Sequence, residues 1–179
     1  ISLTAFTKRI MIRKMNFSIE VGPHTDLDTL PPVKDVYITM LPGGNYKETA
    51  EKSNDLVKRG FNPVPHFPAR SIADEAQLKD YISRCKDVGA KQALVIGGSR
   101  DPIGKFDSSI QILETGFFNG IKVGIAGHPE GSTDMSDTKL EKAMMDKKPY
   151  ADYIVTQWLL DSQPIIDFIS KQSVPVHVG

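Results

Sequence analysis

The chain has 179 residues, of which 40% are hydrophobic and 25% are charged, and these are ordinary proportions for a globular protein. Lysine and arginine together number 22 and balance 22 acidic residues, so no net charge draws the protein to nucleic acid or to an acidic membrane surface. These values exclude a disordered chain and a strongly basic nucleic-acid binder. They favour a single domain whose partner is a small molecule.

The single cysteine, Cys85, has no second cysteine to pair with, which is typical of a reducing compartment and predicts a cytoplasmic protein. No apolar run approaches the roughly 20 residues that cross a bilayer, so we expect no membrane contact. Residues 1–15 are treated as an N-terminal extension because Met15 directly precedes the first predicted strand. Residues 16–179 are expected to form the folded unit.

Short apolar runs rich in β-branched residues recur along the chain, and each run predicts a strand. They occupy residues 17–21, 35–41, 63–67, 92–98, 121–127, 152–160 and 174–179. Proline is too frequent in the first connection, residues 22–34, for a helix to be expected there.

Helical patterns separate most of the other runs. One covers residues 45–60, with Asn45 as its cap, and a second covers 71–89, where Ser71 and Asp74 are expected to form a capping box. Later candidates lie at 108–118, 138–148 and 162–172. Strands that alternate with helices in this way indicate an α/β protein with a parallel sheet covered by helices.

Two parallel architectures compete, the doubly wound open sheet and the (β/α)8 TIM barrel. No GxGxxG or GxxxxGK[ST] motif follows the first strand, and this weakens the nucleotide-binding open sheets. The barrel is therefore favoured. Its typical length is about 250 residues, so a chain of this length with seven predicted strands is expected to form an incomplete barrel.

Functional residues of such barrels gather at the carboxyl ends of the strands. Alternation along the first strand places Glu20 on the opposite face from Ile19 and Val21, so Glu20 is expected to point inward. Poor hydration there would raise its pKa toward values useful for a general acid, and the alternative is a solvated acid at a strand end. His66 lies near the end of the third strand, where the alternative is a core histidine held by hydrogen bonds.

Other chemistry has less support in the sequence. The four histidines are scattered without ligand spacing and no second cysteine exists, so we expect no metal site. No GxSxG motif points to a serine hydrolase. The glycine pair before Ser99 predicts either a phosphate cradle or a plain turn.

Six segments, in order and at suitable spacing, resemble the strand ends of the methylenetetrahydrofolate reductase family. They are FSIEVGP, VYITMLPGG, PVPHFPAR, LVIGGSRDP, IAGHPEG and ADYIVTQWLLD. The resemblance runs from Asn16 to Gly179. It implies a barrel that binds FAD and reduces 5,10-methylenetetrahydrofolate to 5-methyltetrahydrofolate with NADH or NADPH as the electron donor.

The resemblance also implies roles for individual residues. Glu20 matches the general acid, and Gln157 and Asp101 match contacts to the folate. The positions implied to lie beside FAD are Thr39, His66, Asp101, His128 and Lys147.

Some positions depart from the family pattern. An alignment without gaps places Ser99, rather than Asp101, at the acidic position near flavin and folate. His128 stands where relatives often have tyrosine, and Ser132 stands where they carry a second histidine.

Two other functions remain open at this point. One is a pterin-binding barrel that transfers a one-carbon unit without flavin, and the other is a folate-binding fragment without activity. For the reductase, we expect a tetrahydrofolate as the substrate and a homo-oligomer as the assembly.

Overall fold

A computed structural model describes residues 16–133 and 135–179, so the expected N-terminal extension, residues 1–15, lies outside the described residues. Seven parallel strands form one sheet in the order in which they occur along the chain, β1-β2-β3-β4-β5-β6-β7. The strands are β1 (Ser18–Val21), β2 (Asp35–Ile38), β3 (Asn62–Pro68), β4 (Gln92–Ile96), β5 (Lys122–Gly127), β6 (Tyr153–Thr156) and β7 (Val176–His177).

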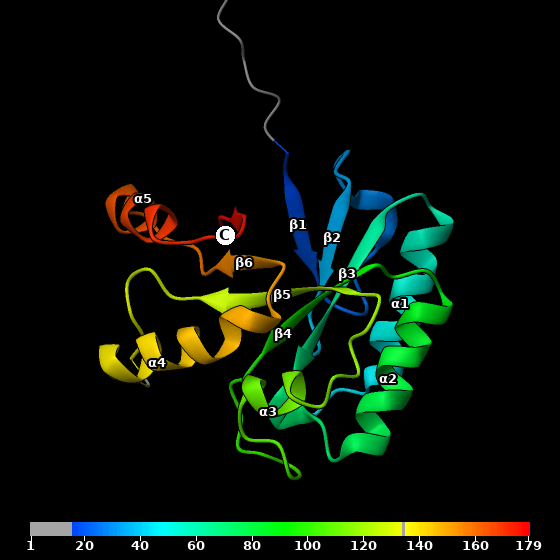
Figure 1. Ribbon diagram of the computed structural model, residues 1–179. Coiled ribbons are helices and arrows are strands. Elements are labelled where there is room, and N and C mark those ends of the chain that lie inside the picture. Colours follow the sequence, from blue (N-terminus) through cyan, green and yellow to red (C-terminus); the bar gives the residue numbers. More distant parts are fainter. Residues whose placement is uncertain (1–15, 134) are drawn as a thin grey trace, which may run out of the picture.

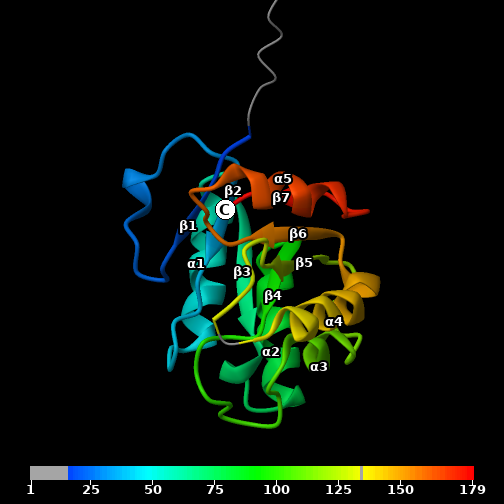
Figure 2. The same cartoon turned by 90° about the vertical axis from the view of Figure 1, so that its left-hand side faces the viewer.

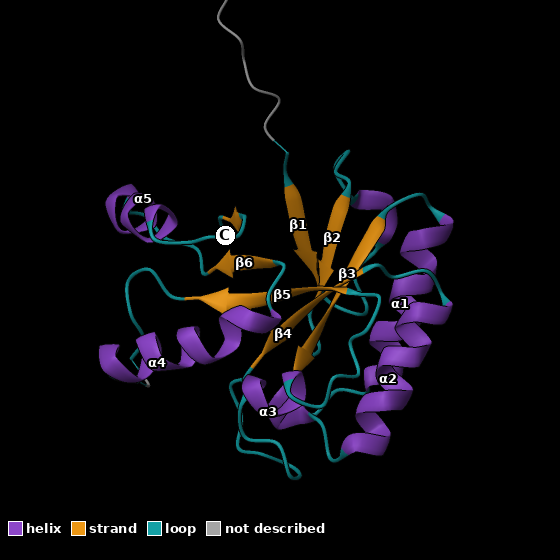
Figure 3. Ribbon diagram, in the orientation of Figure 1, coloured by secondary structure: helices purple, strands orange, loops and turns teal. Residues whose placement is uncertain are grey.

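Helices follow most strands and lie outside the curved sheet (Figure 1, Figure 3). They are α1 (Tyr46–Lys58), α2 (Glu75–Asp87), α3 (Ser109–Leu113), α4 (Asp137–Lys147) and α5 (Ser162–Ser170). Three 3-10 turns, Leu27–Thr29, Ala69–Ser71 and Lys148–Tyr150, complete the described elements. The predicted α/β class and the incomplete barrel of seven strands are confirmed.

Alternation along each strand separates an outer face from an inner face. The outer side chains pack under the helices in the main core, where Phe67, Val95 and Ile125 are fully buried. The inner side chains form a smaller apolar cluster, which consists of Tyr37, Val64, Leu94, Ile96 and Val155. The sheet is therefore covered on its convex side, and its inner side carries the polar groups described below.

The central strand β3 is unusually rich in proline. Asn62 donates its backbone N–H to the carbonyl of Lys34, which directly precedes β2. Because N–H directions alternate along a strand, the backbone nitrogens of Pro63 and Pro65 point toward β4. Proline has no N–H to donate. Pairing with β4 accordingly starts only at His66, which is opposite Leu94.

Several element ends differ from the expectation. The second helix is capped by Asp74, whose carboxylate accepts the N–H of Gln77, while Ser71 belongs to the preceding 3-10 turn. The strand expected over residues 152–160 ends at Thr156. Trp158 and Leu160 lie beyond the sheet, and their exposed fractions are 72% and 87%. The predicted strand was too long because the prediction relied on apolar composition alone.

Candidate functional site

Glu20 and His66 lie on the inner face at the carboxyl ends of β1 and β3. Glu20 Oε2 is 3.7 Å from His66 Nε2, which is too long for a hydrogen bond. His66 is only 4% exposed, and both of its ring nitrogens are buried without a hydrogen-bond partner. Buried polar atoms without partners are rare in proteins, so this imidazole keeps hydrogen-bonding capacity that the described residues do not use.

Burial shifts the two groups in opposite directions. Desolvation lowers the pKa of His66 to about 4, so its ring is neutral at neutral pH. Desolvation also raises the pKa of Glu20 above its ordinary value, although its side chain remains 61% exposed. A neutral imidazole carries one N–H donor and one lone pair. The pair can therefore both accept and donate a proton.

A second polar cluster lies beside this pair on the inner face of the sheet, since Tyr37 is in register with Glu20. Tyr37 Oη is 2.8 Å from Nδ1 of His177, the ring of Tyr153 stacks on His177 at 4.6 Å, and Tyr153 donates its hydroxyl to the carbonyl of Ala93. The Tyr37 ring also meets His66 edge-on, with 6.0 Å between the ring centroids. Desolvation raises the pKa of Tyr37 to about 12, so its hydroxyl stays protonated.

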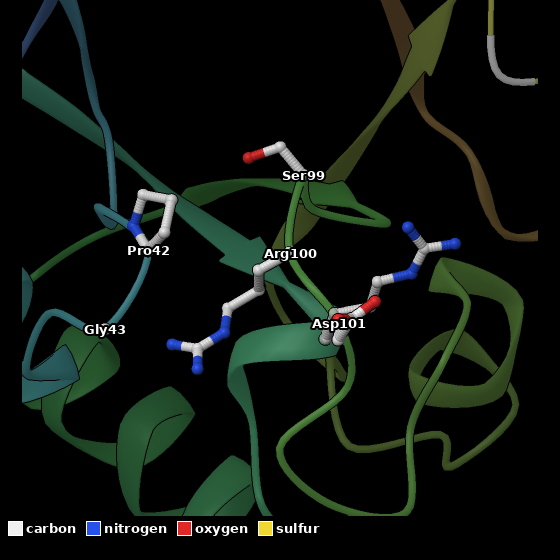
Figure 4. Close-up of a pocket in the computed structure, with 6 residues that line it drawn as sticks. Pro42, Gly43, Ser99, Arg100 and Asp101 are labelled. Atoms are coloured by element: carbon white, nitrogen blue, oxygen red, sulfur yellow. The ribbon is translucent and has the colours of Figure 1, made fainter.

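A cavity of about 660 Å³ opens at the same end of the sheet (Figure 4). Its lining comes from the loops after β2, β3 and β4, and consists of Pro42, Gly43, Arg70, Ser99, Arg100 and Asp101. The volume lies within the range of small-molecule sites. Ser99 and Asp101, the two alternatives for one position in the sequence, both line this cavity.

The other expected site residues lie at separate places. His128 Nδ1 is 3.2 Å from Gln157 Oε1, so these two residues are neighbours at the ends of β5 and β6. Thr39 donates its hydroxyl to the carbonyl of Val21, which ties β2 to β1. Lys147 is 8% exposed, and its Nζ lies 3.4 Å from a backbone carbonyl of β5. Desolvation lowers the pKa of Lys147.

Sequence reasoning missed five residues of this inner region. Arg70 and Arg100 were present in the quoted segments but were not selected as site residues. Tyr37, Tyr153 and His177 were assigned only to strands. For Tyr37 a signal existed, because it shares the parity of Thr39 along the second strand and so faces inward with it.

No protein-family model matches the sequence, but solved structures share its fold. A protein of Burkholderia cenocepacia J2315, provisionally named a lyase/mutase, aligns with a TM-score of 0.67 at 12% identity, over 93% of this chain and 68% of that chain. A second protein of that organism, provisionally named a phosphonomutase, aligns with a TM-score of 0.62 at 11% identity, over 91% and 77%.

The third similar structure is a protein of Coccidioides immitis, provisionally placed in the dihydrodipicolinate synthase family. It aligns with a TM-score of 0.52 at 12% identity, over 82% of this chain and 49% of that chain. The chain is an incomplete TIM barrel. Identities this low show the fold alone.

These comparisons correct the assignment to the methylenetetrahydrofolate reductase family. The similar barrels are of lyase, mutase and synthase type, so the oxidoreductase activity and the flavin-dependent reduction of folate are wrong. The flavin-free pterin barrel and the inactive folate-binding fragment are not supported either. The motifs misled because a polar loop after each parallel strand recurs in barrels of many functions.

Several expectations stay predictions. Binding of FAD, and of NADH or NADPH, was implied only by the corrected resemblance. Across residues 16–133 and 135–179, no helix has the length and apolar character needed to cross a membrane. In the same residues no three His, Cys, Asp or Glu side chains gather as a metal site.

Proposed function

We propose that the chain is the catalytic barrel of a lyase or mutase that acts on a small organic acid. The observation that carries the proposal is the Glu20–His66 pair, which joins a buried imidazole without a partner to a carboxyl group at the barrel mouth. The names of two barrels with the same fold, a lyase/mutase and a phosphonomutase, support the reaction class.

The pair suits reactions in which a proton leaves one substrate atom and another proton is delivered nearby. A lyase that breaks a bond beside a carbonyl takes a proton from a hydroxyl group on one carbon. The bond between that carbon and the carbon beside the carbonyl then breaks, and the carbon that bore the hydroxyl becomes a new carbonyl. The other carbon keeps the bonding electrons and takes up a proton. His66 is neutral near pH 7 and can act as the base, while Glu20 in its protonated form can act as the acid.

The separation of the pair fits this role. At 3.7 Å the two groups do not bond to each other, so neither is saturated before a ligand arrives. Catalytic hydrogen bonds are often long without substrate and shorten when it binds. The exposed side of Glu20 gives a substrate access, and the buried His66 ring lies behind it.

The test uses the purified chain in D2O with a panel of small 2-oxo acids, 2-hydroxy acids and phosphonates. Proton NMR would reveal deuterium uptake or bond cleavage beside the carbonyl, and phosphorus NMR would reveal rearrangement of a phosphonate. We expect one class to react, and Glu20→Gln to slow it by about 10² to 10⁴-fold, as for a lost general acid.

A matched control exists on the surface. His24 and Glu48 form a second histidine–glutamate pair at 3.5 Å, with the His24 side chain 76% exposed. Glu48→Gln should leave the rate unchanged. If no acid in the panel reacts, or if the two variants slow the reaction equally, the proposal is wrong.

We also propose that the protein is cytoplasmic and that it forms a homo-oligomer. The lone cysteine supports the compartment. Cys85 is buried, and desolvation raises its pKa to about 12, so it acts as a structural thiol. Size-exclusion chromatography with light scattering tests the assembly, for which a monomeric mass would be the contrary result.

A further inference from the structure

The cavity at the barrel mouth is lined by two of the four arginines in the described part of the chain. The other two, Arg59 and Arg84, lie on the surface and pair with Asp28 and Asp80. Among the described residues, no ion pair joins the guanidinium of Arg70 or Arg100 to a carboxylate. An unpaired guanidinium in a cavity is a binding group for an anion.

Arg70 is held in place before any ligand arrives. Its Nε donates to the carbonyl of Asp107 at 2.9 Å, and its Nη1 donates to the carbonyl of Gly98 at 3.3 Å. These contacts use two of its five N–H groups and leave three for a ligand. Preorganisation of this kind lowers the entropy lost when a ligand binds.

Arg100 reaches across the cavity from the loop after β4. Its guanidinium extends toward the loop that contains Pro42 and Gly43, and Ser99 lies next to it in the chain (Figure 4). A Cβ on Gly43 would lie 3.5 Å from Arg100 Nη1, and Gly43 has a φ of +79°, which side chains rarely adopt. The backbone conformation therefore favours glycine here, and the distance shows that the Gly43 backbone lies close to the Arg100 guanidinium.

The number of hydrogen-bond donors in the cavity favours a phosphoryl group over a carboxylate as the ligand. A carboxylate is satisfied by one guanidinium fork, whereas a phosphoryl group presents three oxygens that separate donors can share. Two guanidinium groups and the Ser99 hydroxyl line the cavity, and the single carboxylate of Asp101 leaves the lining with a net positive charge.

We infer that this cavity binds the phosphoryl group of the substrate, as a phosphate ester or a phosphonate, through Arg70, Arg100 and the Ser99 hydroxyl. Arg70 follows His66 by four residues, a span of at most about 13 Å in extended chain. One small molecule can therefore reach from this cavity toward the Glu20–His66 pair. That the bound molecule is a substrate rests on the proposed function. The binding of a phosphoryl group in this cavity does not depend on it.

The experiment titrates the full ¹⁵N-labelled chain with inorganic phosphate, methylphosphonate or acetate at constant ionic strength, and follows the backbone amides by NMR. We expect phosphate and methylphosphonate to shift the amides of Gly43 and of residues 98–101. Arg100→Met should weaken binding at least tenfold. Arg84→Met, which removes a surface arginine already paired with Asp80, should leave the affinity unchanged.

One further variant and a folding control keep the result interpretable. Ser99→Ala removes only a hydroxyl and should weaken binding about threefold to tenfold, and circular dichroism confirms that each variant is folded. Binding that Arg100→Met does not weaken, shifts outside the cavity, or equal affinity for acetate would overturn the inference. Stronger binding of methylphosphonate than of phosphate would point to a phosphonate substrate, and the reverse to a phosphate ester.

The outcome is separable from that of the proposed function. Glu20→Gln should leave phosphate affinity unchanged, because Glu20 is not among the cavity residues. If phosphate binds through Arg100 but no acid reacts, the proposed reaction fails and the phosphoryl site stands. If turnover depends on Glu20 but phosphate does not bind, the site fails alone.

Discussion

Tyr37 Oη lies 2.8 Å from His177 Nδ1, although the two residues are 140 positions apart in the chain. Tyr37 belongs to β2 and His177 to β7, and the described strands follow the order β1 to β7 without a pairing that joins the two edges. The side-chain bond therefore connects the two ends of the curved sheet across its inner side. The views in Figure 1 and Figure 2 both place the C-terminal end near β1 and β2.

Tyr37→Phe should loosen β7. The change removes the hydroxyl and leaves His177 Nδ1 without that partner, so we expect the free energy of unfolding to fall by about 1 to 2 kcal/mol. Hydrogen exchange of the β7 amides should speed up more than that of β4. Tyr150→Phe is the control, since Tyr150 is 41% exposed. Equal effects of the two variants would contradict a link between the sheet ends.

The stability of the protein should depend on pH through His66. Its pKa is about 4 in the folded chain against 6.5 in the unfolded chain, so the unfolded state binds the proton first as pH falls. Stability is then highest above pH 6.5 and is lost between pH 6.5 and 4. A shift of this size corresponds to about 3 kcal/mol. Glu20 acts in the opposite sense, because its raised pKa favours the folded state as the carboxyl takes up a proton.

Urea unfolding measured from pH 7.5 to 4.5 tests this dependence. His66→Gln should flatten the curve between pH 6.5 and 5, whereas His24→Gln, which changes an exposed histidine, should keep it. A steep loss of stability that persists in His66→Gln would mean that another group dominates acid unfolding.

Gly124→Ala should be strongly destabilising. A Cβ at this position would lie 2.4 Å from the Tyr153 ring, which belongs to the neighbouring strand. Because the ring stacks on His177 and has little room to move, we expect a loss of about 1 to 3 kcal/mol by thermal unfolding. Gly97→Ala is the control, since nothing lies within 4 Å of its Cβ position. A neutral Gly124→Ala would show that the ring can shift freely.

Lys147→Met should stabilise the protein at pH 7. Desolvation lowers the pKa of this lysine, which means that its charged form is disfavoured in the folded chain. Its contact to the Ala126 carbonyl at 3.4 Å is long and offsets little of that cost. We expect a gain of about 1 kcal/mol. Lys142→Met on the same helix, where the lysine is 76% exposed, should change stability by less than about 0.5 kcal/mol.

Apolar runs rich in β-branched residues predicted the strands. Period-two alternation along the first strand predicted the inward direction of Glu20, because each strand has one face under the helices. The rule that polar groups gather at the carboxyl ends also predicted that Glu20 and His66 belong to one site, and the structure places them 3.7 Å apart. Their chemical roles stay predictions. The element ends were less accurate, since local composition does not show where pairing stops.

Contacts between segments that are distant in the chain could not be predicted from the sequence. Nothing local to Tyr37 or His177 indicates that they meet, since the contact depends on the curvature of the whole sheet. The same limit applies to Arg70 and Arg100. An arginine in a loop is ordinary, and what distinguishes Arg70 and Arg100 from Arg59 is that, among the described residues, neither forms an ion pair with a carboxylate.

The prolines of β3 have a consequence for synthesis on the ribosome. While the chain emerges, β1 to β3 are complete before β4 exists, so β3 is for a time the outer edge of a growing sheet. Exposed edges pair readily with other chains and cause aggregation. Pro63 and Pro65 remove two donors from the edge that awaits β4. With fewer donors, this edge of the three-stranded nascent sheet pairs less readily with other chains until β4 is made.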